Sequence, residues 1–74
     1  MSQMLMGVVN EKGNVDIKTT TGSKSPLKTM NCDGQAVAVT QLLQENGRVI
    51  EVYVQCKDGQ VRVFDNSGSI IRRR

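Results

Sequence analysis

The fold is decided by residues 35–73, which read QAVAVTQLLQENGRVIEVYVQCKDGQVRVFDNSGSIIRR. Within this stretch, Asn46-Gly47 and Asp58-Gly59 are dipeptides preferred in two-residue type I′ turns, because both central positions need a positive φ. The residues on either side of each turn alternate with the period of a β-strand. The stretch therefore predicts three consecutive antiparallel strands joined by two tight hairpins.

Two-residue turns also fix which residues face each other across each hairpin. The expected pairs are Glu45 with Arg48, Leu43 with Ile50, Val39 with Val54, Val37 with Cys56, Cys56 with Val61, Val54 with Val63, Gln55 with Arg62, and Tyr53 with Phe64. Both hairpins then place one apolar set on a shared face, the expected core face: Val37, Val39, Leu43, Ile50, Val52, Val54, Cys56, Val61 and Val63. The opposite face is mixed: Ala38, Thr40, Leu42, Gln44, Val49, Glu51, Tyr53, Gln55, Arg62 and Phe64.

The residues before this stretch are expected to add strands to it. A first hairpin over residues 3–10 and 15–20 turns at Lys12-Gly13, with Val8 opposite Ile17. Met4 and Met6 then join these two residues on its inner face. A polar loop leads to Pro26, followed by a short edge strand over residues 27–32 and a turn at Asp33-Gly34. Residues 70–73 are expected to form the last strand.

Turn glycines recur at intervals of 9 to 13 residues, a spacing typical of short-stranded sandwiches and barrels. The prediction is a single all-β domain over residues 1–74, with five to six short antiparallel strands in a meander, curled into a small barrel or half-barrel. This is similar, in class only, to oligonucleotide-binding and SH3-like barrels. Residues 72–74 are expected to form a basic C-terminal tail.

The size and composition of the chain limit its core and its location. A chain of 74 residues buries only about 60% of its unfolded surface, so we expect a homo-oligomer that uses the mixed face. Residues 1–6 lack a signal-peptide pattern, and no window approaches the roughly 18 apolar residues of a membrane span. We therefore expect a cytoplasmic protein with no membrane partner. Cys32 and Cys56 are then expected to be reduced, with a Cys32–Cys56 bridge as the alternative.

The residue types present argue against catalysis. The chain has no histidine, which removes the commonest general base and the commonest metal ligand. Two cysteines 24 residues apart do not make a zinc site, and no phosphate-loop or dinucleotide fingerprint is present. We expect a protein that is not an enzyme and that binds neither a metal nor a cofactor.

Three features are candidates for binding. Tyr53 and Phe64, with Arg62 beside them, have the composition of a surface that stacks unpaired bases, and the alternative is that they belong to a second core layer or an interface. Phosphate contacts are also expected from basic side chains outside this pair, with solvated segments as the alternative: Lys24 and Lys28 in the polar loop, and Arg72, Arg73 and Arg74 in the tail.

The first functional hypothesis is thus a small non-enzymatic module that binds nucleic acid or a phosphate-bearing nucleotide. A net charge of +3 and an isoelectric point near 9.2 agree with an anionic partner. The alternative is a protein-interaction module, such as an inhibitor, an adaptor or a viral or mobile-element accessory protein. Its partner surface would be the mixed face, with Leu42, Val49, Tyr53 and Phe64. A structural subunit of a larger assembly is the third hypothesis.

Overall fold

The computed structural model describes residues 4–19 and 26–73, and these residues form seven strands and no helix. One antiparallel sheet holds β1 (Leu5–Val9), β2 (Val15–Thr19) and β3 (Lys28–Met30). A second holds β4 (Ala36–Glu45), β5 (Arg48–Cys56), β6 (Val61–Phe64) and β7 (Ile70–Arg73). The expected all-β antiparallel class is confirmed. The strands number seven instead of five or six, and no ladder joins the two sheets within the described residues.

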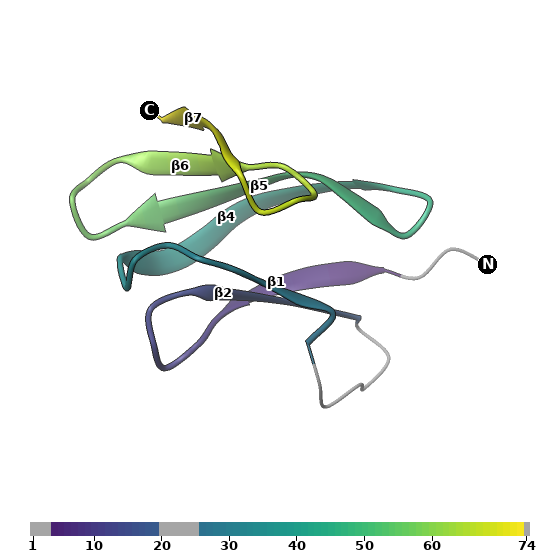
Figure 1. The fold of residues 1–74 in the computed structure, drawn as a ribbon, viewed down its shortest axis with the longest axis horizontal. Coiled ribbons are helices and arrows are strands. Elements are labelled where there is room, and N and C mark those ends of the chain that lie inside the picture. The colour runs from purple at the N-terminus through teal and green to yellow at the C-terminus, as the bar shows by residue number, and fades with distance from the viewer. Residues whose placement is uncertain (1–3, 20–25, 74) are drawn as a thin grey trace.

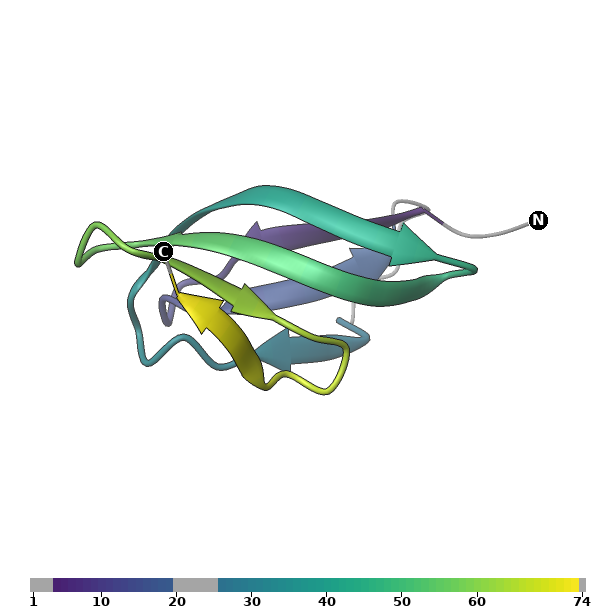
Figure 2. The same cartoon turned by 90° about the horizontal axis from the view of Figure 1, so that it is seen from above.

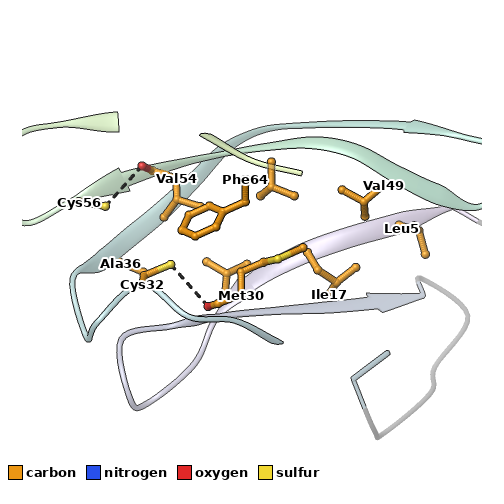
Figure 3. Packing of buried hydrophobic residues seen from close by; sticks show 11 residues of the cluster. Leu5, Ile17, Met30, Cys32, Ala36, Val49, Val54, Cys56 and Phe64 are labelled. Atoms are coloured by element: carbon orange, nitrogen blue, oxygen red, sulfur yellow. Dashed lines mark hydrogen bonds between the residues drawn. The ribbon is translucent and has the colours of Figure 1, made fainter. Parts of the chain in front are cut away.

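The two sheets pack as layers. Figure 1 shows the four-stranded sheet above the three-stranded one, and Figure 2 shows β4 along one margin of the molecule with β7 on the other side. A cluster of buried apolar side chains fills the space between the layers (Figure 3), and it contains Leu5, Val15, Ile17, Met30, Cys32, Ala36, Val49, Val52, Val54, Cys56 and Phe64. The largest of the fully buried side chains is the ring of Phe64.

The Asn46-Gly47 turn has the predicted form. Asn46 has a φ of 54° and Gly47 a φ of 75°, the pair of positive values that a type I′ turn needs. Glu45 pairs with Arg48 across it, and Val39 pairs with Val54 further along the same ladder. The predicted β4–β5 hairpin is therefore confirmed, both in its turn and in these two residue pairs.

Three other turns share a different form, with one more residue in the loop. In each, a glycine N–H donates to the carbonyl three residues earlier, from Gly13 to Asn10 at 3.1 Å, from Gly59 to Cys56 at 3.0 Å and from Gly68 to Asp65 at 3.1 Å. The glycine alone has a positive φ, whereas the residue before it does not. This is the three-residue loop in which a type I turn is followed by a glycine bulge.

The longer loops move the pairing by one residue from the predicted registers. Val54 pairs with Arg62, and Tyr53 with Val63, so the expected pairs of Val54 with Val63 and of Tyr53 with Phe64 are wrong. Cys56 likewise does not face Val61, and Gln55 pairs with Val61 rather than Arg62. In the first hairpin, Ile17 pairs with Gly7 instead of Val8. A one-residue change of register moves every side chain to the other face, so Leu5 is buried where Met4 and Met6 were expected inside.

Irregularities in the β4–β5 ladder explain the remaining differences. The register shifts between Ala36 and Ala38, between Val39 and Gln41, and between Leu43 and Gln44, which leaves Val37, Thr40 and Ile50 as additional residues. Such β-bulges bend a strand and interrupt its alternation. Leu43 consequently pairs with Glu51 instead of Ile50, and Ala36 takes the place expected for Val37 opposite Cys56. A further shift in the last ladder pairs Ile70 with Phe64 and leaves Ile71 as the additional residue.

The predicted core face is correct in its centre and wrong at its ends. Val52, Val54 and Cys56 are buried between the layers as expected. Val37, Leu43 and Ile50 are exposed, whereas two residues assigned to the mixed face, Val49 and Phe64, are in the core. Val63 is buried too, but on the outer face, because paired residues share a face and its partners are Tyr53 and Arg72.

The turns at one end of the molecule join the two sheets. Gly13 O accepts a hydrogen bond from Ala36 N at 2.9 Å, and Asn14 Oδ1 accepts from Cys32 N at 2.8 Å. A Cβ at Gly13 would lie 2.4 Å from Gly34 O, so glycine is needed here for its size as well as for its φ of +78°.

Replacing Gly13 with alanine is therefore expected to destabilise the fold more than the same change at Gly59. Gly59 has a φ of +84°, but a Cβ added there would have no neighbouring atom within 4 Å, so Gly59→Ala should lose only the about 1–2 kcal/mol of a left-handed alanine. Gly13→Ala adds the contact with backbone and should lose at least about 3 kcal/mol in total. Urea unfolding of both variants measures the difference, and equal losses would contradict this account of the junction.

Candidate functional site

The two aromatic residues proposed to stack bases lie on opposite faces of the four-stranded sheet. Phe64 pairs with Val52 and is fully buried in the core, whereas Tyr53 pairs with Val63 and is half-buried on the outer face. The expected platform of adjacent Tyr53 and Phe64 rings is thus corrected, because the three-residue loop before β6 turns Phe64 inward. The partner surface expected from the mixed face is corrected for the same reason, since Val49 and Phe64 are in the core.

Arg62, expected to contact phosphate, is instead 9% exposed, and its side chain bonds to other parts of the protein. Its Nη1 donates to the Cys32 carbonyl at 3.2 Å and lies 3.6 Å from Asp33 Oδ2, and its Nη2 lies 3.6 Å from Asp58 Oδ2. Cys32 and Asp33 belong to the turn before β4, and Asp58 belongs to the turn between β5 and β6. The guanidinium therefore joins turns that leave different sheets, and its charge is balanced by two carboxylates.

Arg72 is held on the outer face of the same sheet. Its Nη2 forms an ion pair with Glu51 Oε2, and the other oxygen of Glu51 accepts a hydrogen bond from the Tyr53 hydroxyl at 3.1 Å. Glu51 and Tyr53 are on β5, and Arg72 is on β7, so the three side chains span the intervening strand β6 at the buried Val63. Tyr53 and Arg72 thus take part in a structural network.

The other predicted basic residues divide into three groups. The Nζ of Lys28 donates to the carbonyl of Asn66 and to its side-chain oxygen, which links β3 to the turn before β7. Arg73 is exposed on β7 opposite Arg62. Lys24 and Arg74 lie outside the described residues. The structure brings Arg62, Arg72 and Arg73 onto neighbouring strands, but it directs the first two toward carboxylates.

Two open hollows are lined by polar turn residues. The larger one lies between the β4–β5 turn and the β6–β7 turn, lined by Glu45, Asn46, Arg48, Val49, Ile50, Asp65, Asn66 and Ser67. Hydrogen bonds from the Ser67 side chain, and from the backbone of Ser69 and neighbouring residues, lower the pKa of the Asp65 carboxyl. In the smaller hollow, Asp16 Oδ1 accepts from Asn10 Nδ2 at 3.0 Å and from Thr29 Oγ1 at 2.9 Å. These polar groups already bond to one another, as expected of turns.

Cys32 and Cys56 are buried free thiols, so the alternative of a bridge between them is not observed. Each Sγ lies 3.6 Å from a backbone carbonyl oxygen, that of Met30 for Cys32 and that of Val54 for Cys56 (Figure 3). Burial, together with the nearby Cys56, raises the pKa of Cys32 from 9.0 to about 11. Thiolates are the reactive and metal-binding form, so this environment suits packing better than chemistry. Among residues 4–19 and 26–73, no group of three or more acidic, cysteine or histidine side chains is placed to hold a metal ion.

The surface that sequence reasoning missed is formed by uncharged residues of β1 and β4. No charged residue occurs from Met4 to Asn10 or from Gln35 to Gln44. These strands lie together, because Leu5 N donates to Gln44 Oε1 at 2.7 Å and a Cβ at Gly7 would lie 3.1 Å from the Val39 side chain. We call the exposed residues here the uncharged side, and they are Met4, Met6, Val37, Ala38, Thr40, Gln41 and Leu43.

The apolar side chains of the uncharged side are more exposed to solvent than apolar side chains of a sheet usually are. Met4 is 64% exposed, Val37 54% and Leu43 37%. The sequence signal for this surface is the absence of charge over the ten residues 35–44. Because residues 36–40 alternate in the β-strand period, this segment was predicted to face the core.

Comparison with protein-family models, curated proteins and solved structures finds no match to this chain. In the part of the chain that the structure describes, no helix is long and apolar enough to cross a membrane. Function is therefore inferred from the surface itself.

Removing the guanidinium of Arg62 is expected to destabilise the fold. Arg62→Met removes one of two hydrogen bonds to the Cys32 carbonyl, which keeps the one from Gln35 N at 2.9 Å, and it breaks the ion pairs with Asp33 and Asp58. The side chains of Asp33 and Asp58 are 74% and 41% exposed and regain water. We expect a loss of about 2 kcal/mol, typical of a hydrogen bond donated by a charged group. Arg73→Met, at the exposed ladder partner, should change stability by no more than about 0.5 kcal/mol. Urea unfolding that finds the two variants equally stable would refute the structural role.

The folded chain is expected to resist alkylation. With a pKa of about 11, only about a thousandth of Cys32 is thiolate at pH 8, and both sulfur atoms are buried. Iodoacetamide should therefore modify both residues in urea and neither in buffer, as followed by mass spectrometry. Because the folded pKa exceeds the unfolded value of 9.0, stability should hold below pH 9 and fall as the pH rises toward 11. Rapid labelling of Cys32 in the folded chain would contradict its burial.

Proposed function

We propose that this protein is a non-enzymatic protein-interaction module whose contact surface is the uncharged side. The observation that supports it is that β1 and β4 approach each other with no charged residue from Met4 to Asn10 or from Gln35 to Gln44, and that Met4, Met6, Val37 and Leu43 are exposed in these segments. In the half-barrel expected from the sequence, the two sheets would meet along this side, where β1 and β4 approach each other.

A protein partner suits this surface better than a polyanion does. Apolar area removed from water contributes about 25 cal/mol per Å² to association, and an uncharged strand carries no ionised group whose desolvation would oppose it. Exposed apolar patches bordered by polar residues are typical of protein interfaces. Two of the residues expected to contact nucleic acid, Arg62 and Phe64, have their side chains inside the molecule.

Nucleic-acid binding is the second candidate, supported by one feature. Arg72 and Arg73 lie on the exposed strand β7, and the chain carries a net charge of +3. Polyanion binding through these residues would rest on counterion release and would weaken steeply with salt.

The two candidates are separated by matched lysine substitutions. Leu43→Lys alters the uncharged side and Ile71→Lys alters β7, where Ile71 is 46% exposed, so each adds one charge at an exposed apolar position. We expect proteins captured from a lysate by the immobilised wild-type chain to be retained by Ile71→Lys and lost, by about tenfold or more, with Leu43→Lys.

A nucleic-acid titration completes the comparison. Fluorescence anisotropy with a labelled single-stranded oligonucleotide pool is expected to show no binding that depends on Arg72 and Arg73. Salt-sensitive binding that is abolished in an Arg72→Gln, Arg73→Gln double variant, with capture unaffected by Leu43→Lys, would overturn the proposal in favour of the second candidate.

A further inference from the structure

The Asn46-Gly47 turn brings together two groups that can react with each other without an enzyme. The backbone nitrogen of the residue after an asparagine can attack the side-chain carbon Cγ of that asparagine and close a five-membered ring. A side chain on the attacking residue hinders this approach, and glycine has none. Asparagine is accordingly counted among the heat-labile residues of proteins. An asparagine before glycine therefore reacts most readily, provided that its surroundings leave it free.

Asn46 is the only one of the five asparagines that precedes a glycine. In the other four, the side-chain oxygen accepts a hydrogen bond, and these are Asn10, Asn14, Asn31 and Asn66. Asn46 is exposed, and in the part of the chain that the structure describes its side chain forms no hydrogen bond or ion pair. Its amide is thus free to move toward the nitrogen of Gly47.

The tip of the β4–β5 hairpin also offers room for the ring to close. Figures 1 and 2 show this turn projecting beyond the β6–β7 turn, and none of residues 45–48 is buried. A Cβ added at Gly47 would have no atom within 4 Å apart from its neighbours in the chain, so the rest of the fold does not crowd the attacking nitrogen. The attack requires the turn to open locally. Exposed loop tips without buried apolar contacts open at little cost in free energy.

Two aspartate-glycine turns show how a comparable side chain is held in place. Asp33 and Asp58 also precede glycines, but each carboxylate lies 3.6 Å from the guanidinium of Arg62. An ionised carboxylate is a poorer target for a nucleophile than an amide, because it already carries negative charge. Of these three turns, only the one at Asn46 combines a reactive amide with an unbonded side chain.

We propose that Asn46 is a site of spontaneous deamidation that alters the β4–β5 hairpin with time. The bond from Gly47 N to Asn46 Cγ forms while the Cγ–Nδ2 bond breaks, and Nδ2 leaves as ammonia with the proton of the Gly47 amide. Water then opens the ring. Addition at Cγ gives aspartate, and addition at the backbone carbonyl carbon of Asn46 gives isoaspartate, in which the main chain passes through Cγ. No oxidant or reductant takes part.

Deamidation changes the charge of the hairpin tip and, in one product, its backbone. Either product places a new carboxylate in the larger hollow, which Glu45 and Asp65 also line, and Arg48 offsets only part of this charge. Aspartate keeps the turn, because Asp-Gly is also a preferred type I′ pair. Isoaspartate adds one carbon to the main chain of the turn, which then no longer fits the pairing of Glu45 with Arg48. The isoaspartate form should therefore be the less stable of the two.

The experiment compares the folded chain with the same chain in guanidinium chloride. Both are kept in warm, mildly alkaline buffer until half of the unfolded sample has reacted at Asn46. Brief trypsin digestion releases residues 29–48 as one peptide, which carries both Asn31 and Asn46, and tandem mass spectrometry locates the change from amide to acid. We expect Asn46 in the folded chain to react within about tenfold of the unfolded rate, because the tip opens readily, and Asn31 to stay unchanged.

Two variants serve as matched controls, because Gly-Gly and Asp-Gly are also preferred type I′ pairs. Asn46→Gly retains the turn without the amide, so it should lack the acidic species that cation exchange separates from the aged wild-type chain. Asn46→Asp should elute with one of the two aged species, and the other, the isoaspartate form, should unfold at a lower urea concentration. A folded-state rate more than about tenfold below the unfolded rate, acidic species that persist in Asn46→Gly, or an isoaspartate form as stable as Asn46→Asp would each overturn the proposal.

Discussion

The buried guanidinium of Arg62 is the interaction on which the two-layer arrangement depends. A chain of this length has a small aliphatic core, so contacts that fix how its layers meet contribute a large share of its order. Arg62 points inward from β6 beside Phe64 and reaches the turn before β4 and the turn after β5. The Gly13 and Asn14 contacts secure the same end of the molecule. Polar bonds between turns of the two sheets thus hold this end of the molecule together.

Residue patterns predicted the strands well and their faces only in part. Asn46-Gly47 was sufficient because both residues accept a positive φ. Lys12-Gly13 and Asp58-Gly59 look similar, yet only the glycine has a positive φ there, and the extra loop residue reverses the facing of the strands. Burial decides between the alternatives at β6: the observed register buries Phe64 between the layers, whereas the expected one would bury Val63 there. Local turn preference does not contain this information.

The candidate site was less predictable because the ion-pair partner of a charged side chain can lie far away in the sequence. Arg62 is matched by Asp33 and Arg72 by Glu51, and no spacing rule relates these pairs. Residue type suggested phosphate contacts, and tertiary structure assigned ion pairs instead. The sequence also gives no sign of the bulges in β4, because residues 36–40 alternate regularly. The lack of charge over residues 35–44 can be read from the sequence, but only the strand order shows that this segment is the first strand of its sheet.

The order of the strands also has a consequence for how the molecule folds. Every ladder joins strands that are consecutive in sequence, so each sheet is built from short-range contacts and requires no long loop to close. Contacts between the sheets, such as Leu5 with Gln44 and Lys28 with Asn66, join residues 38 to 39 positions apart. Because closing a longer loop costs more chain entropy, we expect the hairpins within each sheet to form before the contacts between the sheets, among them the ion pair of Arg62 with Asp33.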